Sequence, residues 1–159
     1  MGAKVDLANQ GREKIVFGLD SVIIRKYISG IIGGRTLEVP NDYPLQVIYA
    51  GHAIITDGNG LYKPMPIVAK TETTGEGDAA VTTNVTDEDG NQVYVYGSLP
   101  SGYSYAGVLY RSVKKSNPQA AIMTNGEVNS EAVKVSFDNI KTAFLAACPH
   151  IVLTKDEEA

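Results

Sequence analysis

Apolar and polar residues follow a strand pattern from about residue 44 onward. The stretch PLQVIYAGHAIITDGNGLYKPMPIV holds two apolar runs separated by Asp57-Gly58-Asn59-Gly60. Asp-Gly and Asn-Gly steps supply the positive φ angles that tight turns need, so this stretch predicts a β-hairpin. Pro64 and Pro66 have no backbone N–H group, which predicts that the return strand lies at a sheet edge.

Two further hairpins are predicted downstream. Residues 105–129, YAGVLYRSVKKSNPQAAIMTNGEVN, consist of a strand, a charged turn and a second strand that ends near an Asn-Gly step. The stretch TTNVTDEDGNQVYVYG predicts another hairpin with Asp89-Gly90 at its turn. In that hairpin Tyr94 and Tyr96 would share one face, because side chains alternate along a strand.

One segment, SFDNIKTAFLAACPH, has the pattern of a helix. Ser136 is the expected N-cap, and Pro149 is expected to end the helix. The expected buried stripe, at positions i, i+3, i+4 and i+7, is Ile140, Ala143, Phe144 and Ala147. Residues 151–153 predict a closing strand. The predicted fold class is therefore mainly β, with one short C-terminal helix.

The first 40 residues have a different pattern. Apolar pairs and triplets are broken by Gly18, Gly30 and the Gly33-Gly34 pair, and neither a helical nor a strand period persists. One interpretation is an extended N-terminal arm, residues 1–40, that lies on another molecule. The isoleucines expected to bind there are Ile23, Ile24, Ile28, Ile31 and Ile32. The other interpretation is a first strand and a short helix of the same core.

Residues 71–92 carry six Asp or Glu and no Lys or Arg, and Val81 and Val85 are their only large apolar residues. Such a segment adds little to a core, so we expect a surface excursion at about residues 68–92. A solvated loop or hairpin is the simpler interpretation, and an acidic recognition patch is the other. Residues 41–159 otherwise form the expected β domain.

Composition limits the classes of function. A chain of 159 residues with 43% apolar residues and a net charge of −4 is an ordinary globular composition, which does not favour nucleic-acid binding. The longest aliphatic runs are three residues, so we expect no membrane span, and residues 1–20 lack the apolar stretch of a secretory signal. Cys148 is the only cysteine, which excludes an intrachain disulfide.

Catalytic signals are absent from the sequence. His52 and His150 are almost a hundred residues apart and do not form a four-ligand zinc set. The acidic turns at Asp57 and Asp87 lack the ligand spacing of an EF-hand loop. Cys148 follows a predicted helix C-terminus and is expected to be a small buried residue rather than a nucleophile. We therefore expect no enzyme activity, no metal and no cofactor.

Several motifs together resemble bacteriophage head decoration proteins of the lambda type, some of which are labelled head fibre proteins in phages of gut bacteria. The resemblance is carried by AGVLYRSV, by AAIMTNGEVN and by the helix that ends in AFLAACPHIVL. Upstream, GGRTLEVP and IYAGHAIITDGNGLYKPMPI also resemble this family. The similarity covers about residues 33–67 and 99–153, and the acidic excursion is an insertion relative to the shorter family members.

The resemblance implies a β-clip-like fold and a homotrimer that binds the outside of an icosahedral phage capsid. The implied partner is the major capsid protein, the implied location is the virion exterior, and the chain would be made in the bacterial host cytoplasm. The arm would add backbone pairing to the capsid lattice. The residues that match the family pattern, with an implied structural role, are Gly107, Leu109, Gly126, Val128 and Asn129.

A second function class remains open from the sequence. A β-rich module that binds carbohydrate or another surface ligand would have a similar strand pattern. Such a module needs exposed aromatic side chains on one flat face, and the chain has nine tyrosines. Tyrosine is also common at protein interfaces and in strands generally, so their number alone does not separate the two classes.

Overall fold

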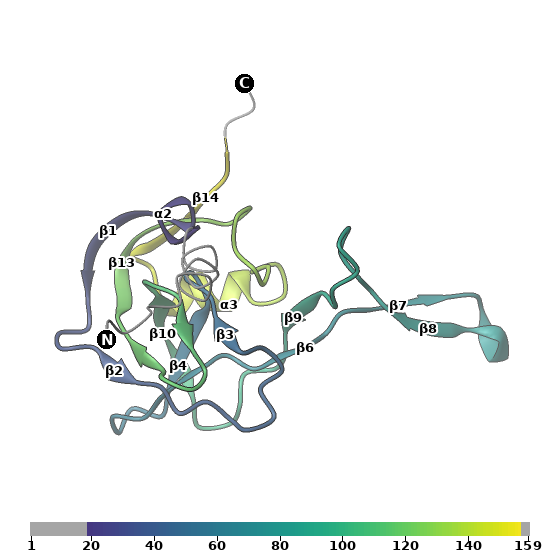
Figure 1. The fold of residues 1–159 in the computed structure, drawn as a ribbon, viewed down its shortest axis with the longest axis horizontal. Helices are drawn as coiled ribbons and strands as arrows, with labels where there is room; N and C mark the ends of the chain where they lie inside the picture. Colours follow the sequence, from purple (N-terminus) through teal and green to yellow (C-terminus); the bar gives the residue numbers. More distant parts are fainter. Residues whose placement is uncertain (1–18, 157–159) are drawn as a thin grey trace, which may run out of the picture.

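The computed structural model describes residues 19–156, which form a mainly β fold (Figure 1). The main path of its six-stranded sheet runs through β1 (Ile24–Gly30), β13 (Ile122–Asn129), β10 (Ser104–Leu109), β4 (Ala53–Thr56) and β5 (Tyr62–Pro64). Strand β14 (Ile151–Thr154) pairs in parallel with β13, and the other pairings are antiparallel. The predicted mainly β class with a short C-terminal helix is confirmed.

Strands β4 and β5 form the hairpin predicted around residues 57–60. Ile54 pairs with Pro64 and Thr56 pairs with Tyr62. The carboxylate of Asp57 accepts hydrogen bonds from the backbone N–H groups of Asn59 and Leu61, at 2.8 and 3.2 Å, and so closes the turn. Strand β5 is the last on the path of the sheet, which confirms the edge position predicted from its prolines.

Residues 19–156 also form four smaller two-stranded sheets. They are β2 (Arg35–Thr36) with β12 (Gln119–Ala120), β3 (Val47–Ile48) with β11 (Val113–Lys114), β6 (Ile67–Ala69) with β9 (Tyr94–Tyr96), and β7 (Thr71–Thr74) with β8 (Val81–Asn84). The hairpin predicted over residues 105–129 forms, with Val108 opposite Met123. Its connection is not a plain turn, because β11 and β12 leave it to pair with β3 and β2.

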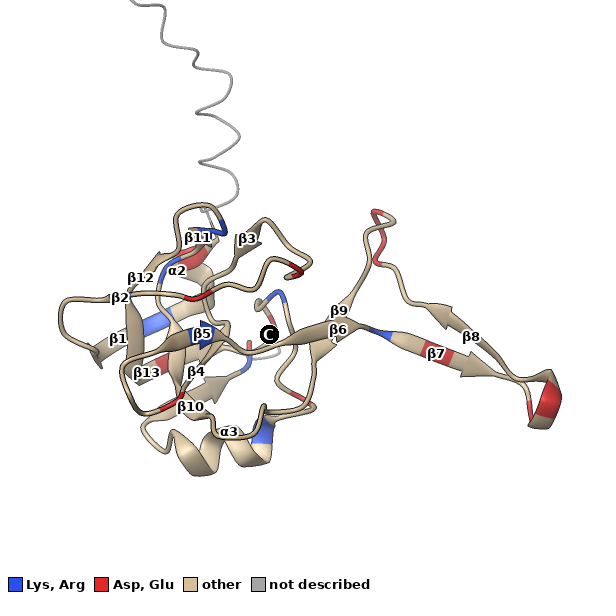
Figure 2. Cartoon of the chain, turned by 90° about the horizontal axis from the view of Figure 1, so that it is seen from below, with Lys and Arg blue, Asp and Glu red and all other residues tan. Residues whose placement is uncertain are grey.

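Strands β7 and β8 project from the body of the molecule, joined through a 3-10 turn at Gly77–Ala79 (Figures 1 and 2). We call residues 71–84 the ribbon. All eight residues of its two strands are exposed. The predicted turn at Asp89-Gly90 forms, with Gly90 at φ +80°. The hairpin around this turn is short: Thr86 bridges Gln92, and the N–H of Val93 donates a 2.9 Å hydrogen bond to the carbonyl oxygen of Val85. Beyond Val93, β9 pairs with β6 instead.

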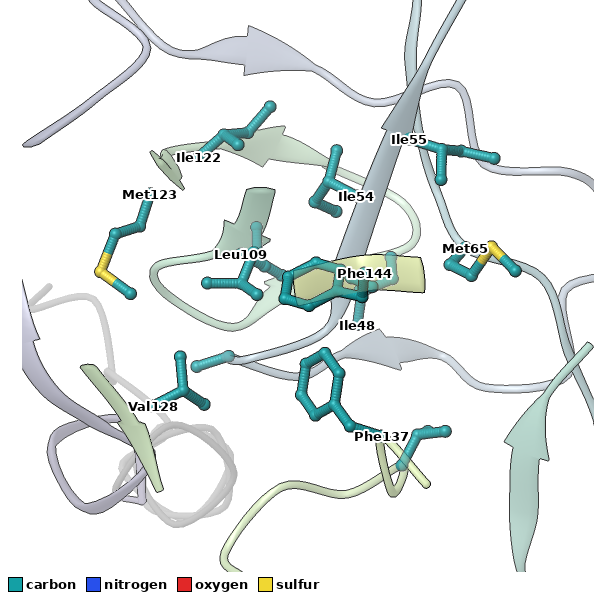
Figure 3. Packing of buried hydrophobic residues seen from close by; sticks show 14 of the residues in the cluster. Ile48, Ile54, Ile55, Met65, Leu109, Ile122, Met123, Val128, Phe137 and Phe144 are labelled. Carbon is teal, nitrogen blue, oxygen red and sulfur yellow. The ribbon is translucent and has the colours of Figure 1, made fainter. Parts of the chain in front are cut away.

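The core lies between the main sheet and α3 (Lys141–Ala147) (Figure 3). The ring of Phe144 is fully buried and lies 5.0 Å from the ring of Phe137 and 5.5 Å from that of Tyr105. The fully buried aliphatic side chains around these rings include Ile48, Ile54, Leu109, Ile122 and Val128. One short helix therefore covers the sheet mainly through a single aromatic side chain.

The details of α3 differ from the prediction. Ile140 occupies the N-cap position, and the hydroxyl of Ser136 accepts a hydrogen bond from the N–H of Asp138 in a preceding turn. The buried positions are Ile140, Phe144 and Cys148, whereas Ala143 and Ala147 are exposed. The helix is short enough to lay one row at i, i+4 and i+8 on the sheet, so the wider stripe expected from the sequence does not form.

Residues 19–36 are part of this fold, which corrects the expectation that they belong to a separate arm. After the single turn α2 (Asp20–Ile23), β1 pairs with β13 along the edge of the main sheet. Ser112 holds α2 in place, because its N–H and hydroxyl donate hydrogen bonds of 2.8 and 2.6 Å to the two carboxylate oxygens of Asp20. The second interpretation, a strand and short helix of the same core, describes this part of the segment.

Two glycines allow the central strands to approach closely. A Cβ atom at Gly126 would lie 2.2 Å from the carbonyl oxygen of Lys26 on β1, and one at Gly107 would lie 2.3 Å from that of Met123 on β13. Both distances are shorter than any Cβ contact that a structure tolerates, so neither position accepts a side chain without a backbone shift. The pairing of β13 with β1 and β10 therefore depends on these glycines.

We expect Gly126→Ala to lower the free energy of unfolding by about 2–3 kcal/mol, because the strands must separate to admit the methyl group. The control is Gly97→Ala, where the new Cβ would lie 3.5 Å from Val68 in ordinary contact; its effect should stay within about 0.5 kcal/mol. Urea titration of both variants measures the difference. Equal losses would contradict the close approach at Gly126.

Candidate functional site

The two histidines do not meet in a reactive site. His52 is buried, and its Nε2–H donates a 2.9 Å hydrogen bond to the carbonyl oxygen of Met65. Its ring lies 5.1 Å from that of Tyr96 and 6.1 Å from that of Tyr43. Burial lowers the pKa of His52 to about 4, although the Met65 hydrogen bond opposes this shift. His52 is therefore a neutral core residue, while His150 is exposed.

Cys148 lies at the C-cap of α3 and is buried in the core. Burial raises the pKa of its thiol to about 11, so the thiolate form is disfavoured at neutral pH. The prediction of a small buried residue at this position is confirmed.

The acidic turns use their carboxylates to hold their own backbone. Asp87 accepts hydrogen bonds from the N–H groups of Asp89 and Asn91, at 3.0 and 2.8 Å. The bond from Asn91 is the largest cause that lowers the pKa of Asp87. Within residues 19–156, no group of three or more His, Cys, Asp or Glu side chains is placed to hold a metal ion. No helix in the same range is long and apolar enough to cross a membrane.

The five residues singled out by the sequence resemblance come together on β10 and β13. Leu109 and Val128 are fully buried, and Gly107 and Gly126 are the close-approach positions described above. The side chain of Asn129 is buried, donates to Asp156 at 3.2 Å and accepts from the N–H of Glu131 at 3.1 Å. In this structure all five positions hold strands and loops together.

The five isoleucines of the expected arm divide into two groups. Ile23 and Ile24 are 2% and 7% exposed and pack in the core of this chain, so they are not available to a partner. Ile31 is half-buried, whereas Ile28 is 54% and Ile32 93% exposed. The register of β1 against β13 shifts at three points after Ile24, so β1 does not keep the regular alternation of a strand.

Exposed apolar side chains are concentrated beside these isoleucines. Nine large apolar side chains are exposed in the described residues, and five of them lie between residues 19 and 32. We call this set the edge segment: Leu19, Val22, Tyr27, Ile28 and Ile32. No other described strand pairs with the outer edge of β1, so its backbone groups are also open on that side. An apolar surface next to an unpaired strand edge is suited to binding another protein.

Three residues of the edge segment carry no recognisable signal in the sequence, namely Leu19, Val22 and Tyr27. The number of tyrosines does not locate a binding surface, because eight of the nine are buried or half-buried and Tyr27 alone is exposed. The ring of Tyr27 rests 4.6 Å from that of Tyr110. Only the pairing of β1 with β13 tells which side of this segment faces outward.

Comparison of the chain with protein-family models, with curated proteins and with solved structures found no match.

The burial of His52 predicts a loss of stability in mild acid. Its folded pKa of about 4 lies below the unfolded value of 6.5, so the unfolded chain binds more protons between these values. Above about pH 6.5 the protonation of His52 does not lower the free energy of unfolding. Between about pH 6.5 and 4 it lowers the free energy of unfolding by at most about 1.4 kcal/mol per pH unit.

Urea titrations between pH 7.5 and 4.5, at one protein concentration, test this prediction. The His52→Gln variant should lack that part of the slope, whereas His150→Gln should keep it, because His150 is exposed. Identical slopes for the wild type and His52→Gln would contradict the assignment.

Proposed function

We propose that this chain is a structural protein of a bacteriophage head, which binds the outside of the capsid as a homotrimer and stabilises the shell. It acts as a head decoration, or auxiliary capsid, protein in a β-clip-like fold. Its partner is the major capsid protein. The single observation that carries this proposal is the edge segment, an exposed apolar surface along an open strand edge. The order of the family-like motifs in the sequence supports it.

Attachment to the capsid occurs through the outward part of the segment that the sequence suggested. Ile28 and Ile32, with the half-buried Ile31, supply apolar contact, and the free edge of β1 supplies backbone hydrogen-bonding groups. A strand of the capsid protein that pairs with this edge would satisfy both. Ile23 and Ile24 take no part in this contact, because they stabilise the chain itself.

A trimer would bind a capsid more tightly than one chain, because its three edge segments would bind together. One edge segment offers only a few side chains, each worth roughly 1.5–3 kcal/mol when fully buried. Three linked copies bind at the threefold positions of a shell as one unit, so three weak contacts give a long-lived attachment. The carbohydrate-binding alternative gains no support from the described residues, since Tyr27 is their one exposed aromatic side chain.

The attachment proposal predicts that Ile28→Asp combined with Ile32→Asp abolishes binding to capsids. The capsids are those of the phage that encodes this chain, prepared without it, and binding is measured by co-sedimentation. The apparent affinity should fall at least about tenfold, because two buried side chains are replaced by charges. Melting temperature and solution mass should stay close to those of the wild type, since both side chains are exposed.

Val152→Asp is the matched control, because Val152 is 51% exposed on β14, outside the edge segment. It should bind capsids normally. Full binding by the double variant would place the attachment elsewhere. The test uses point variants, because removal of residues 1–36 would delete β1 from the main sheet and should unfold the body.

The trimer proposal predicts a mass of three chains, each of 17.0 kDa, by light scattering at micromolar protein concentration. The mass should persist across a tenfold dilution. A monomer mass throughout would contradict it.

A further inference from the structure

The ribbon has almost no support from its own chain. Its four cross-strand pairs run from Thr71 with Asn84 to Thr74 with Val81, and every one of these residues is exposed. An isolated two-stranded hairpin is at best marginally stable in water. Exposed apolar side chains also occur on it, at Val81, and on the neighbouring strand β6, at Val68. These features indicate a ribbon that is covered by a partner.

The charge distribution favours a partner that carries positive charge. The ribbon and the turn after it, residues 71–92, hold six acids and no base. The remainder of the described chain holds eleven Lys or Arg against eight Asp or Glu. Figure 2 shows the acidic residues of β7 and the adjoining turns at one end of the molecule. A ribbon laid against the ribbon of another copy would bring like charges together, whereas the body of another copy attracts it.

Within the body, the connection between β10 and β13 is the most basic stretch. Residues 110–119 contain Arg111, Lys114 and Lys115 and no acid, and we call them the basic loop. Arg111 is exposed and lies 5.2 Å above the ring of Tyr110. The ammonium group of Lys115 donates to the carbonyl oxygens of Asn41 and Tyr43, at 2.7 and 2.9 Å, and fixes the loop on the body.

The ribbon and the basic loop of one chain lie apart. In Figure 2 β11, which belongs to the basic loop, lies at the top of the body, whereas β7 and β8 project away from the body to the right. The two surfaces also differ from each other. A contact between them is therefore a head-to-tail contact between copies, and such contacts close into rings when the rotation between copies allows it.

From these observations we propose that the ribbon of each copy docks on the basic loop of the next copy and holds the trimer together. This inference rests on the proposed function, because it gives the trimer of the decoration protein its interface. Opposite charges make the contact selective, and the exposed Val81 and threonines of the ribbon add direct packing contacts. Association should therefore weaken as salt is raised, because exposed charges are screened beyond about 8–10 Å at physiological ionic strength.

Charge reversal with rescue tests this interface. The ribbon variant carries Glu72→Lys, Glu76→Lys and Asp78→Lys, which spare the turn-forming Asp87. The loop variant carries Arg111→Glu and Lys114→Glu and spares Lys115, which anchors the loop. Each should raise the concentration at which half of the chains are monomeric by about tenfold or more. The chain with all five changes should recover most of the association.

Sedimentation at about 50 mM and about 500 mM salt measures each variant, with melting curves to verify the fold. Lys141→Glu combined with Lys155→Glu is the control, because it reverses two bases outside the basic loop. A second test replaces residues 71–92 by an Asn-Gly turn between Lys70 and Val93, where the N–H of Lys70 already donates to the Val93 carbonyl oxygen. This shortened chain should fold and be monomeric.

The outcomes separate the two proposals. A trimer that survives ribbon reversal and ribbon removal overturns this inference and leaves the proposed function intact. Normal trimers that lose capsid binding on ribbon reversal also overturn it, because the ribbon would then contact the shell. A wild type that is monomeric under all conditions contradicts both the proposed trimer and this interface. If the ribbon variant and the loop variant both associate weakly and the chain with all five changes does not recover association, the proposed contact between the ribbon and the basic loop is contradicted.

Discussion

Strand β13 is the element on which the rest of the structure depends, because it pairs with three other strands. It binds β1 along one edge and β10 and then β14 along the other. These approaches are close enough that Gly107 and Gly126 have no room for a methyl group. The sheet brings together residues near both ends of the described chain, so the free energy gained there is shared by segments that are far apart in sequence.

The position of the edge segment follows from this pairing. The register between β1 and β13 shifts at three points, and after the buried Ile24 the next five residues of β1 are exposed. Ile24 faces the core opposite Val128, while Ile28 ends on the outside only four residues later. In a regular strand, Ile24 and Ile28 would face the same side. Their different exposure is therefore a result of the irregular pairing of β1 with β13, which sets the position of the edge segment.

Local features of the fold could be predicted from sequence because local chemistry decides them. The turn at Asp57–Gly60, the edge position of Pro64 and the buried Cys148 need only neighbouring residues to be explained. The strand at residues 24–30 was ambiguous, since its pairing partner is about a hundred residues away and its bulges remove any regular period. The same holds for the candidate site. Its isoleucines were identified, but which of them face outward depends on contacts such as that between Asp20 and Ser112.

The two proposed contact surfaces differ in the forces that act on them. The edge segment is apolar and next to an open strand edge, so its binding energy arises at direct contact and responds little to salt. The ribbon and the turn after it hold six acids and no base, so the proposed attraction to the basic loop would act over a longer range and be screened by ions. Two surfaces with such different responses can bind two different partners without competing. A trimer would therefore form through the charged surface first, and its three apolar edges would then meet the shell together, which is the order that multivalent attachment requires.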